Sequence, residues 1–276
     1  MNYAEVIGEP IGHSKSPIIH KYWLERLAIE GDYRKTMVAG VDLPAFTAAR
    51  RRDPDWRGCN VTIPHKQAII PLLDRVDRGA ETIGAVNCVV REGSVLAGYN
   101  TDVDGIAAAL DSAELTGRKA TVIGAGGGAR ALITYLARRD AEIIILARNP
   151  AKAEELRQLA TLQIRPLDAA EQAFTDAAAI INASPLGMSG AELMPRALID
   201  AIRAHSTSAT LFDMVTTPTE TKFLAAGREG GGRTVDGLTM LVGQAARAFE
   251  WFYGAPPPRP DEALRKLLIE DMPDSA

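Results

Sequence analysis

The chain has 276 residues, of which 46% are hydrophobic and 24% are charged, and its 31 Lys and Arg against 35 Asp and Glu give a net charge of −4. This composition excludes a disordered chain, and no apolar run approaches the roughly 20 residues that cross a bilayer. The acidic balance argues against nucleic acid binding, so we interpret the short run Arg50 to Arg52 as a solvated helix end.

The start of the chain lacks a basic segment followed by an apolar one, the pattern of an export signal. Its two cysteines, Cys59 and Cys88, form neither a disulfide framework nor a CxxC pair. We therefore expect a cytoplasmic protein that binds a small molecule, with no nucleic acid or membrane partner, as a monomer or a homodimer.

Short apolar runs alternate with helix-length amphipathic segments, which predicts an α/β protein with mainly parallel sheets. In the first hundred residues the spacing is irregular. Strands are expected at 4–7, 33–38, 59–62, 86–90 and 95–99, and helices at 16–30 and 41–52.

From residue 120 the alternation becomes regular, which predicts a doubly wound Rossmann domain. The expected order is strand 120–123, helix 129–139, strand 142–146, helix 151–160, and strands 179–182 and 210–213. A buried-face helix at 240–253 follows, then a proline-rich connector at 254–260 and an amphipathic helix at 261–270.

A glycine-rich segment stands between the first of these regular strands and its helix. Glycines at such a turn let the backbone approach a pyrophosphate, whose charge is met by unpaired N–H groups and the helix dipole. The alternative is a tight connector with no ligand, but the strand, turn, helix and strand order favours dinucleotide binding. The candidate residues are Gly124, Ala125, Gly126, Gly127 and Gly128.

The end of the second regular strand indicates the type of dinucleotide. An acidic residue there binds the ribose 2′-hydroxyl of NAD, whereas an arginine accommodates the 2′-phosphate of NADP. The segment 146–152 has no carboxylate and contains Arg148 and Lys152. The pattern favours NADP(H), with a solvated arginine at a helix start as the alternative.

Four segments of the first half place small polar residues among glycine and proline near strand ends, where ligands of open α/β sheets bind. We expect one pocket to collect them. They are residues 12–17, 58–66, 84–87 and 98–102.

These segments resemble the shikimate dehydrogenases, including their quinate/shikimate dehydrogenase relatives. The similarity lies in a GxPIxHSxSP element at 8–17, NVTxPxK at 60–66, GAVN at 84–87 and NTDxxG at 100–105. The glycine-rich turn and a GLxMLxxQA element at 237–245 extend it to about residues 5–254.

The resemblance implies reversible NADPH-dependent reduction of 3-dehydroshikimate to shikimate, a step toward chorismate and the aromatic amino acids. By similarity, Lys66 and Asp102 are the catalytic pair. An ammonium within hydrogen-bond reach of a ketone oxygen can neutralise and protonate it as hydride adds to the carbon. A solvated lysine after a strand is the alternative for Lys66.

The remaining expected site residues are neutral donors and acceptors, which suit a ligand with several hydroxyls. By similarity, Ser14 and Ser16 hold the substrate carboxylate, although Ser16 before a proline also suits a helix N-cap. Thr62 and Asn87 have the alternative of pinning loops, whereas Gln244 stands on an apolar helix face and needs a polar partner. The full expected substrate set is Ser14, Ser16, Asn60, Thr62, Asn87, Thr216 and Gln244.

Two departures from the family pattern bear on specificity. Thr216 stands where the family has a tyrosine near the substrate, which removes a ring and a long-reach hydroxyl. The family's NRT element reads Ala147-Arg148-Asn149, so recognition of the 2′-phosphate depends mainly on Arg148 and Lys152. The expected cofactor set also includes Asn149, Met214 and Gly237, and no metal-ligand spacing links the histidines.

The expected architecture has two domains. Residues 1–102 with 239–276 form an α/β domain that binds substrate, and residues 103–238 form the Rossmann domain that binds NADP, with the C-terminal helices returning to the first. A quinate/shikimate or amino-shikimate dehydrogenase is the alternative enzyme, motivated by Thr216. A dinucleotide-sensing protein without catalysis is the alternative of another class.

Overall fold

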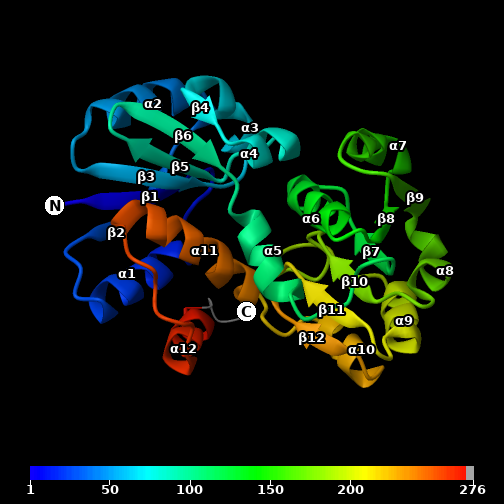
Figure 1. Ribbon diagram of the computed structural model, residues 1–276. Helices are drawn as coiled ribbons and strands as arrows, with labels where there is room; N and C mark the ends of the chain where they lie inside the picture. The colour runs from blue at the N-terminus through cyan, green and yellow to red at the C-terminus, as the bar shows by residue number, and fades with distance from the viewer. Residues whose placement is uncertain (272–276) are drawn as a thin grey trace. The chain divides into compact units, whose positions relative to one another are not determined.

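The computed structural model describes residues 1–271 and divides into two compact units. Unit 1 comprises Met1–Asp102 and Val242–Asp271, and unit 2 contains Val103–Leu241. The chain therefore leaves unit 1 once and returns to it near its end, and the colours of Figure 1 follow this path. Each unit is an α/β fold with a sheet of its own.

Unit 1 contains a six-stranded sheet in the order β2-β1-β3-β5-β6-β4. The sheet is mixed, because β5 runs antiparallel to both of its neighbours whereas the other pairs are parallel. The strands are β1 (Tyr3–Gly8), β2 (Asp32–Met37), β3 (Trp56–Val61), β4 (Arg75–Val76), β5 (Cys88–Glu92) and β6 (Val95–Tyr99).

The reversed direction of β5 places all four polar segments at one edge of this sheet. Three of them follow the carboxyl ends of β1, β3 and β6, which point the same way. The fourth, 84–87, precedes β5, and the start of an antiparallel strand lies at the edge where its neighbours end. Backbone bonds from Val61 N to Asn87 O (2.8 Å) and from Asn87 N to Tyr99 O (3.0 Å) fix this junction.

Helices cover the sheet of unit 1. The segment expected as helix 16–30 ends earlier, at Arg26, and Ala28 then takes a positive φ of 51°. The helices are α1 (Ser16–Arg26), α2 (Leu43–Arg52), α3 (His65–Ala68), α4 (Arg78–Ile83), the later part of α11 (Gly237–Tyr253) and α12 (Glu262–Glu270), with 3-10 turns at Gly40–Asp42 and Ile70–Leu72.

The expected solvated arginine run, 50–52, is wrong at its first residue. Arg50 is not a solvated helix end, because its Nε donates to Glu5 Oε1 at 2.6 Å and Glu5 is 0% exposed. Glu5 also accepts from Trp56 Nε1 at 2.7 Å. A carboxylate on an inward-facing strand position needs a counterion, and Arg50 supplies it.

Unit 2 contains a six-stranded parallel sheet in the order β12-β11-β10-β7-β8-β9. In chain order this is the arrangement 3-2-1-4-5-6, which confirms the doubly wound Rossmann prediction and puts the topological switch between β7 and β10. The strands are β7 (Lys119–Ile123), β8 (Glu142–Ala147), β9 (Leu162–Pro166), β10 (Ala179–Asn182), β11 (Thr210–Asp213) and β12 (Arg233–Val235).

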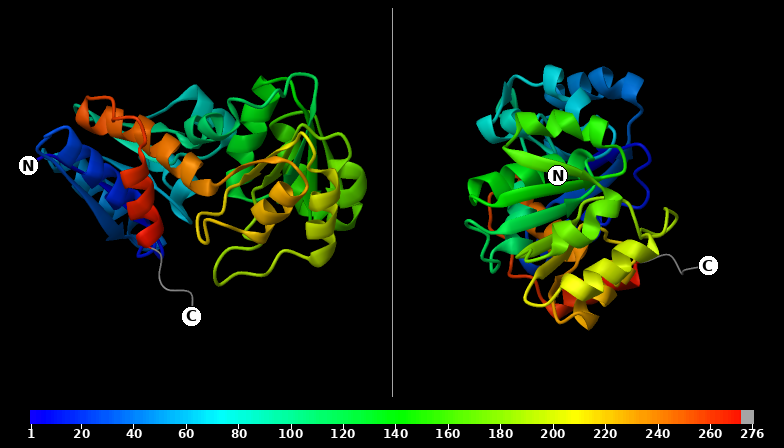
Figure 2. Two further views of the ribbon diagram at one scale, coloured as in Figure 1. Left: turned by 90° about the horizontal axis from the view of Figure 1, so that it is seen from below. Right: turned by 90° about the vertical axis from the view of Figure 1, so that its right-hand side faces the viewer.

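Helices flank the sheet of unit 2 (Figure 2). The core beneath them includes Phe174, Leu211 and Phe223, all nearly inaccessible to solvent. The helix expected at 151–160 is only one α turn that continues as a 3-10 segment, because few of its residues are buried against the sheet. The helices are α5 (Asp102–Leu110), α6 (Gly127–Arg138), α7 (Pro150–Ala153), α8 (Ala170–Phe174), α9 (Arg196–His205) and α10 (Lys222–Glu229), with 3-10 turns at Glu154–Gln158 and Leu167–Ala169.

Among the helices described in residues 1–271, none has the length and apolarity required to span a bilayer.

A neutral histidine lies in the core of unit 1. His20 is 0% exposed, and its ring stacks on that of Tyr33 with 3.9 Å between centroids. Neither His20 ring nitrogen has a hydrogen-bond partner within residues 1–271. Burial lowers the pKa of His20 from 6.5 to about 3. Because the unfolded chain takes up this proton at a higher pH than the folded protein does, stability falls as the pH drops from about 6.5 toward 3.

Replacing His20 with phenylalanine, which keeps an aromatic ring against Tyr33, should remove this pH dependence. Between pH 7 and pH 5 the free energy of unfolding of the wild type should fall by about 2 kcal/mol more than that of His20→Phe. Urea denaturation of both proteins at both pH values measures the difference. The buried carboxyl of Asp213, whose pKa is raised to about 6, acts in the opposite direction but is common to both proteins. Equal losses in the two proteins would contradict the assignment.

Candidate active site

Lys66 and Asp102 form an ion pair in unit 1. Lys66 Nζ donates to Asp102 Oδ2 at 2.6 Å, and the side chains are 25% and 10% exposed. Lys66 lies in the short helix α3, and His65 Nε2 lies 2.7 Å from the carbonyl oxygen of Val38, so this ring nitrogen carries the proton and donates. The helix that presents the ammonium is thereby tied to the residue after β2.

Asn87 holds the carboxylate of the pair. Its Nδ2 donates to Asp102 Oδ1 at 2.9 Å, so both carboxylate oxygens are engaged. Its Oδ1 accepts from the backbone N–H of Thr101 at 2.7 Å, and Asn87 is only 3% exposed. Asn100 Oδ1 accepts from the Asp102 N–H at 3.0 Å. Asp102 is therefore fixed in position and rotamer before any ligand binds.

Two further expected residues join the same network. Asn60 Nδ2 lies 3.4 Å from Asn87 O, and Asn60 Oδ1 accepts from the buried Tyr33 hydroxyl at 2.6 Å. The hydroxyl of Thr101 lies 3.3 Å from Gln244 Oε1, which gives this polar residue of the apolar helix face a partner. The network thus links side chains from β3, from the loops before β5 and α5, and from α11.

The serine pair lies at the start of α1. The Ser14 and Ser16 hydroxyl oxygens are 3.4 Å apart, and the Ser16 N–H points to Ser14 Oγ at the same distance. Ser16 is not the N-cap, since that position belongs to Lys15, so its hydroxyl is not used for capping. Thr62 lies beyond β3 and against Gly8, where an added Cβ would come within 2.5 Å of Thr62 Cγ2.

In unit 2 a cavity of about 330 Å³ opens over the switch between β7 and β10. Gly124 has φ of 104°, and a Cβ there would lie 2.8 Å from Ser184 Cβ, so only glycine permits this turn. Gly127 begins α6, a 12-residue helix whose first N–H groups are available to an anion. The lining includes the expected residues Gly124, Ala125, Gly126, Arg148, Asn149 and Lys152.

The basic end of this cavity has its own contacts. Arg148 Nη2 donates to Glu192 Oε2 at 2.6 Å, and both side chains are more than 60% exposed. Asn149 Oδ1 accepts from the Lys152 N–H at 3.2 Å, so this residue caps α7. Arg148 and Lys152 remain accessible to a phosphate at the end of β8.

Met214 lies against two glycines of unit 2. A Cβ on Gly128 would come within 2.9 Å of Met214 Cε, and one on Gly237 within 2.9 Å of Met214 O. Thr216 follows in the loop after β11, in unit 2, whereas the other expected substrate residues belong to unit 1.

The loop after β10 is not among the predicted site segments, yet it contributes Ala183, Ser184, Pro185 and Leu186 to the cavity. The buried Asn182 orders this loop, because its Oδ1 accepts from Ser184 N and Oγ and its Nδ2 donates to Leu186 O. The available signal was a serine beside a proline just beyond the predicted strand 179–182, the position where ligands of open α/β sheets bind.

Within residues 1–271, no cluster of three or more His, Cys, Asp or Glu side chains is arranged to hold a metal ion.

Three protein-family models match successive parts of the chain. The shikimate dehydrogenase substrate binding domain matches residues 6–89, the shikimate/quinate 5-dehydrogenase model matches 107–218, and the shikimate 5′-dehydrogenase C-terminal domain matches 237–265.

Curated relatives and solved structures agree with these matches. The NADP(+)-dependent shikimate dehydrogenase of Sphingopyxis alaskensis is 46% identical over 97% of both chains, and that of Mesorhizobium japonicum is 42% identical over 98% of this chain and 96% of its own. The Thermus thermophilus shikimate 5-dehydrogenase, crystallised with NADP(H) and shikimate, is 31% identical, with a TM-score of 0.83 and 98% and 99% coverage. The Listeria monocytogenes shikimate 5-dehydrogenase, in complex with shikimate and NAD, is 29% identical, with a TM-score of 0.87 and 97% and 96% coverage.

Three models of one family match successive parts of the sequence, and curated relatives match nearly its full length. This chain therefore belongs to the shikimate dehydrogenase family.

Proposed function

We propose that this chain catalyses the reversible NADPH-dependent reduction of 3-dehydroshikimate to shikimate. The contact between Lys66 and Asp102 at 2.6 Å is the observation that carries the proposal, since it is the acid–base pair that ketone reduction needs. The family assignment and the basic end of the Rossmann cavity support the substrate and the cofactor.

Unit 1 holds the substrate in this proposal and unit 2 holds the cofactor. Ser14 and Ser16 bind the substrate carboxylate, and Asn60, Thr62 and Gln244 contribute donors and acceptors for the ring hydroxyls. The N–H groups at the start of α6 receive the pyrophosphate, Arg148 and Lys152 receive the 2′-phosphate, and Met214 and Gly237 complete the cofactor site.

NADPH, when bound, supplies the hydride that adds to the ketone carbon. Lys66 Nζ donates a hydrogen bond to the ketone oxygen and transfers a proton as negative charge grows there. Asp102 orients the ammonium and accepts a hydrogen bond from a substrate hydroxyl. Asn87 acts through Asp102, because its Nδ2 hydrogens are already directed to Asp102 and Thr101. Solvent can return the proton to Lys66, whose side chain is 25% exposed.

This reaction belongs in the route to aromatic amino acids, and we place it in the cytoplasm. Cys59 and Cys88 are buried and are not joined in a disulfide, which suits a reducing compartment.

Replacing Lys66 with methionine removes the proton donor while preserving most of the side-chain volume. Because general acid catalysis contributes about 10² to 10⁴ in rate, kcat should fall by that factor while KM for shikimate changes much less. Steady-state absorbance of the reduced nicotinamide measures both constants. A wild type that binds NADPH tightly but turns over neither shikimate nor quinate would favour the dinucleotide-sensing alternative instead.

Arg148→Ala should weaken NADP(+) binding about tenfold and leave NAD(+) binding within about twofold, because only NADP carries the phosphate that the guanidinium contacts. Isothermal titration calorimetry with each cofactor measures the two Kd values. Arg157→Ala is the matched control, since Arg157 is a half-exposed arginine of the same segment that pairs with Glu154. Equal losses for both cofactors would overturn the phosphate assignment.

Thr216 supports a second candidate, a quinate/shikimate or amino-shikimate dehydrogenase. Thr216→Tyr restores the family's ring and hydroxyl, so kcat/KM for shikimate should rise several-fold relative to kcat/KM for quinate. Thr216→Val is the control that removes only the hydroxyl. If the wild type already prefers quinate, the second candidate replaces the first.

A further inference from the structure

The C-terminal helix α12 lies beside α1 within unit 1 (Figures 1 and 2). Its apolar side includes Leu264 and Leu268, each 1% exposed. Residues near the start of α12 contact the second half of α1, and a residue near its end is bonded to Lys15, which immediately precedes α1. The two helices are therefore antiparallel and are joined at both ends.

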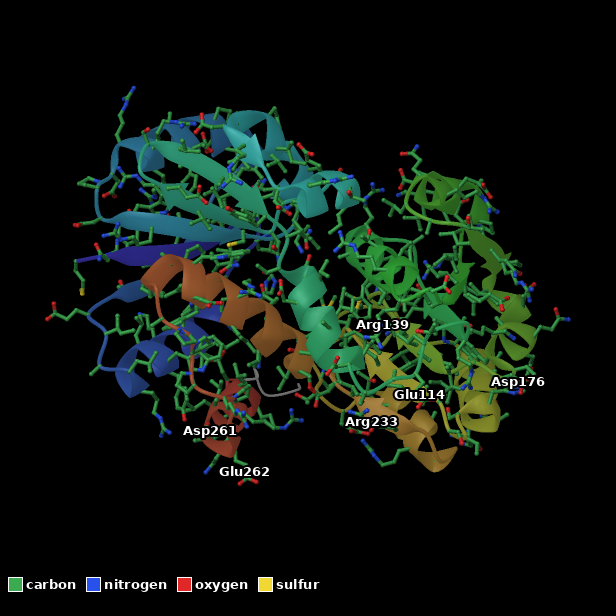
Figure 3. All side chains as sticks on the ribbon, viewed as in Figure 1. Glu114, Arg139, Asp176, Arg233, Asp261 and Glu262 are labelled. Carbon is green, nitrogen blue, oxygen red and sulfur yellow. The ribbon has the colours of Figure 1, made fainter. Side chains whose placement is uncertain are left out.

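Asp261 makes the junction at the start of α12, where Figure 3 labels it. Its carboxylate caps the helix by accepting from Leu264 N at 2.9 Å. The same carboxylate accepts from the Tyr22 hydroxyl, with O···O distances of 2.8 and 2.7 Å, and Arg26 lies 3.7 Å away. One acidic side chain thus fixes the helix start and docks it on α1.

Lys15 makes the junction at the other end. Its ammonium donates to the carbonyl oxygen of Leu268 in the last turn of α12, where the carbonyl groups lack helical partners. Lys15 is only 6% exposed, although lysine is seldom buried. It stands between Ser14 and Ser16, so the serine pair flanks the residue that holds α12.

We propose that α12 is a clamp that fixes the Ser14–Ser16 loop through Lys15, and that Lys15 and Asp261 are positioning residues for the substrate carboxylate. The inference rests on the proposed function, in which the two serines bind that carboxylate.

The loop needs such support because little else holds it. Gly12 and His13 are exposed. Lys35 Nζ donates to Gly12 O at 2.7 Å and Ser14 N donates to Ile11 O at 3.1 Å, whereas the 3.4 Å contacts of Ser14 Oγ with Ser16 stay within the loop itself. A loop that must be ordered when substrate binds loses affinity by the entropy of that ordering. The loss appears in KM rather than in kcat, because the serines contact a group remote from the reacting carbon.

Lys15→Met, Asp261→Ala and Tyr22→Phe test the clamp from both ends. KM for shikimate should rise about tenfold in the first two and about threefold in Tyr22→Phe, with kcat and the Kd for NADP(+) within twofold of the wild type. Lys266→Met is the matched control, because Lys266 is an exposed lysine of α12 that pairs only loosely with Glu270 at 3.7 Å, and its KM should not change.

Asp261→Ala distinguishes two explanations for a role of Lys15 in substrate binding, the clamp and direct charge attraction between Lys15 and the substrate. Removing a negative charge should leave KM unchanged or lower it if Lys15 acts by charge alone, whereas the clamp requires KM to rise. Tyr22→Phe alters no charge and keeps the test decisive if Asp261→Ala does not fold. A rise in KM confined to Lys15→Met would overturn the proposal.

Hydrogen exchange of the backbone amides of residues 12–18 gives a readout independent of catalysis. Exchange there should be faster in Lys15→Met and Asp261→Ala than in the wild type and Lys266→Met, with exchange in unit 2 unchanged. Unaltered exchange in both variants would also overturn the clamp. A wild type without shikimate turnover would contradict the proposed function and leave this comparison valid.

Discussion

The proposed reaction depends on one interaction, the 2.6 Å contact between the Lys66 ammonium and the Asp102 carboxylate. The two residues lie 36 positions apart, after different strands, and the sheet brings them together because β3 and β6 end at the same edge. Asn87 contributes from the loop just before β5, the strand between them. Because β5 runs opposite to β3 and β6, Asn87 just before β5 lies beside the residues that follow those two strands. The side-chain amide of Asn87 can therefore bond to Asp102 directly.

Preorganisation of the pair has an energetic consequence. A carboxylate whose two oxygens already accept from Lys66 and Asn87 needs little rearrangement when charge develops on a substrate oxygen nearby. The pair is only partly buried, so the desolvation cost of a deeply buried ion pair is avoided while water is reduced around it. The side chains of the surrounding network, Asn60, Asn87 and Gln244, are neutral and add no further charge beside the pair.

Much of this was predictable from the sequence, and the failures have physical reasons. The Rossmann order and the glycine turn follow from local periodicity and spacing, and Lys66 and Asp102 follow from the motifs that carry the family resemblance. The hydrogen bond from Asn87 to Asp102 depends on the antiparallel direction of β5. A run of apolar residues predicts a strand but not the direction in which that strand runs within the sheet. The ion pair of Arg50 is not visible in the local sequence, because its partner Glu5 is 45 residues away. The segment 151–160 has helical periodicity but buries too little surface to sustain a full helix.

A crystal structure of the protein with shikimate and NADP(+) tests the central claim most directly. We expect Lys66 Nζ and an oxygen of Asp102 to lie within about 2.6–3.2 Å of the oxygen on the carbon that is oxidised, with Asn87 still bonded to Asp102. A bound shikimate whose reacting oxygen lies beyond hydrogen-bond reach of both side chains would contradict it.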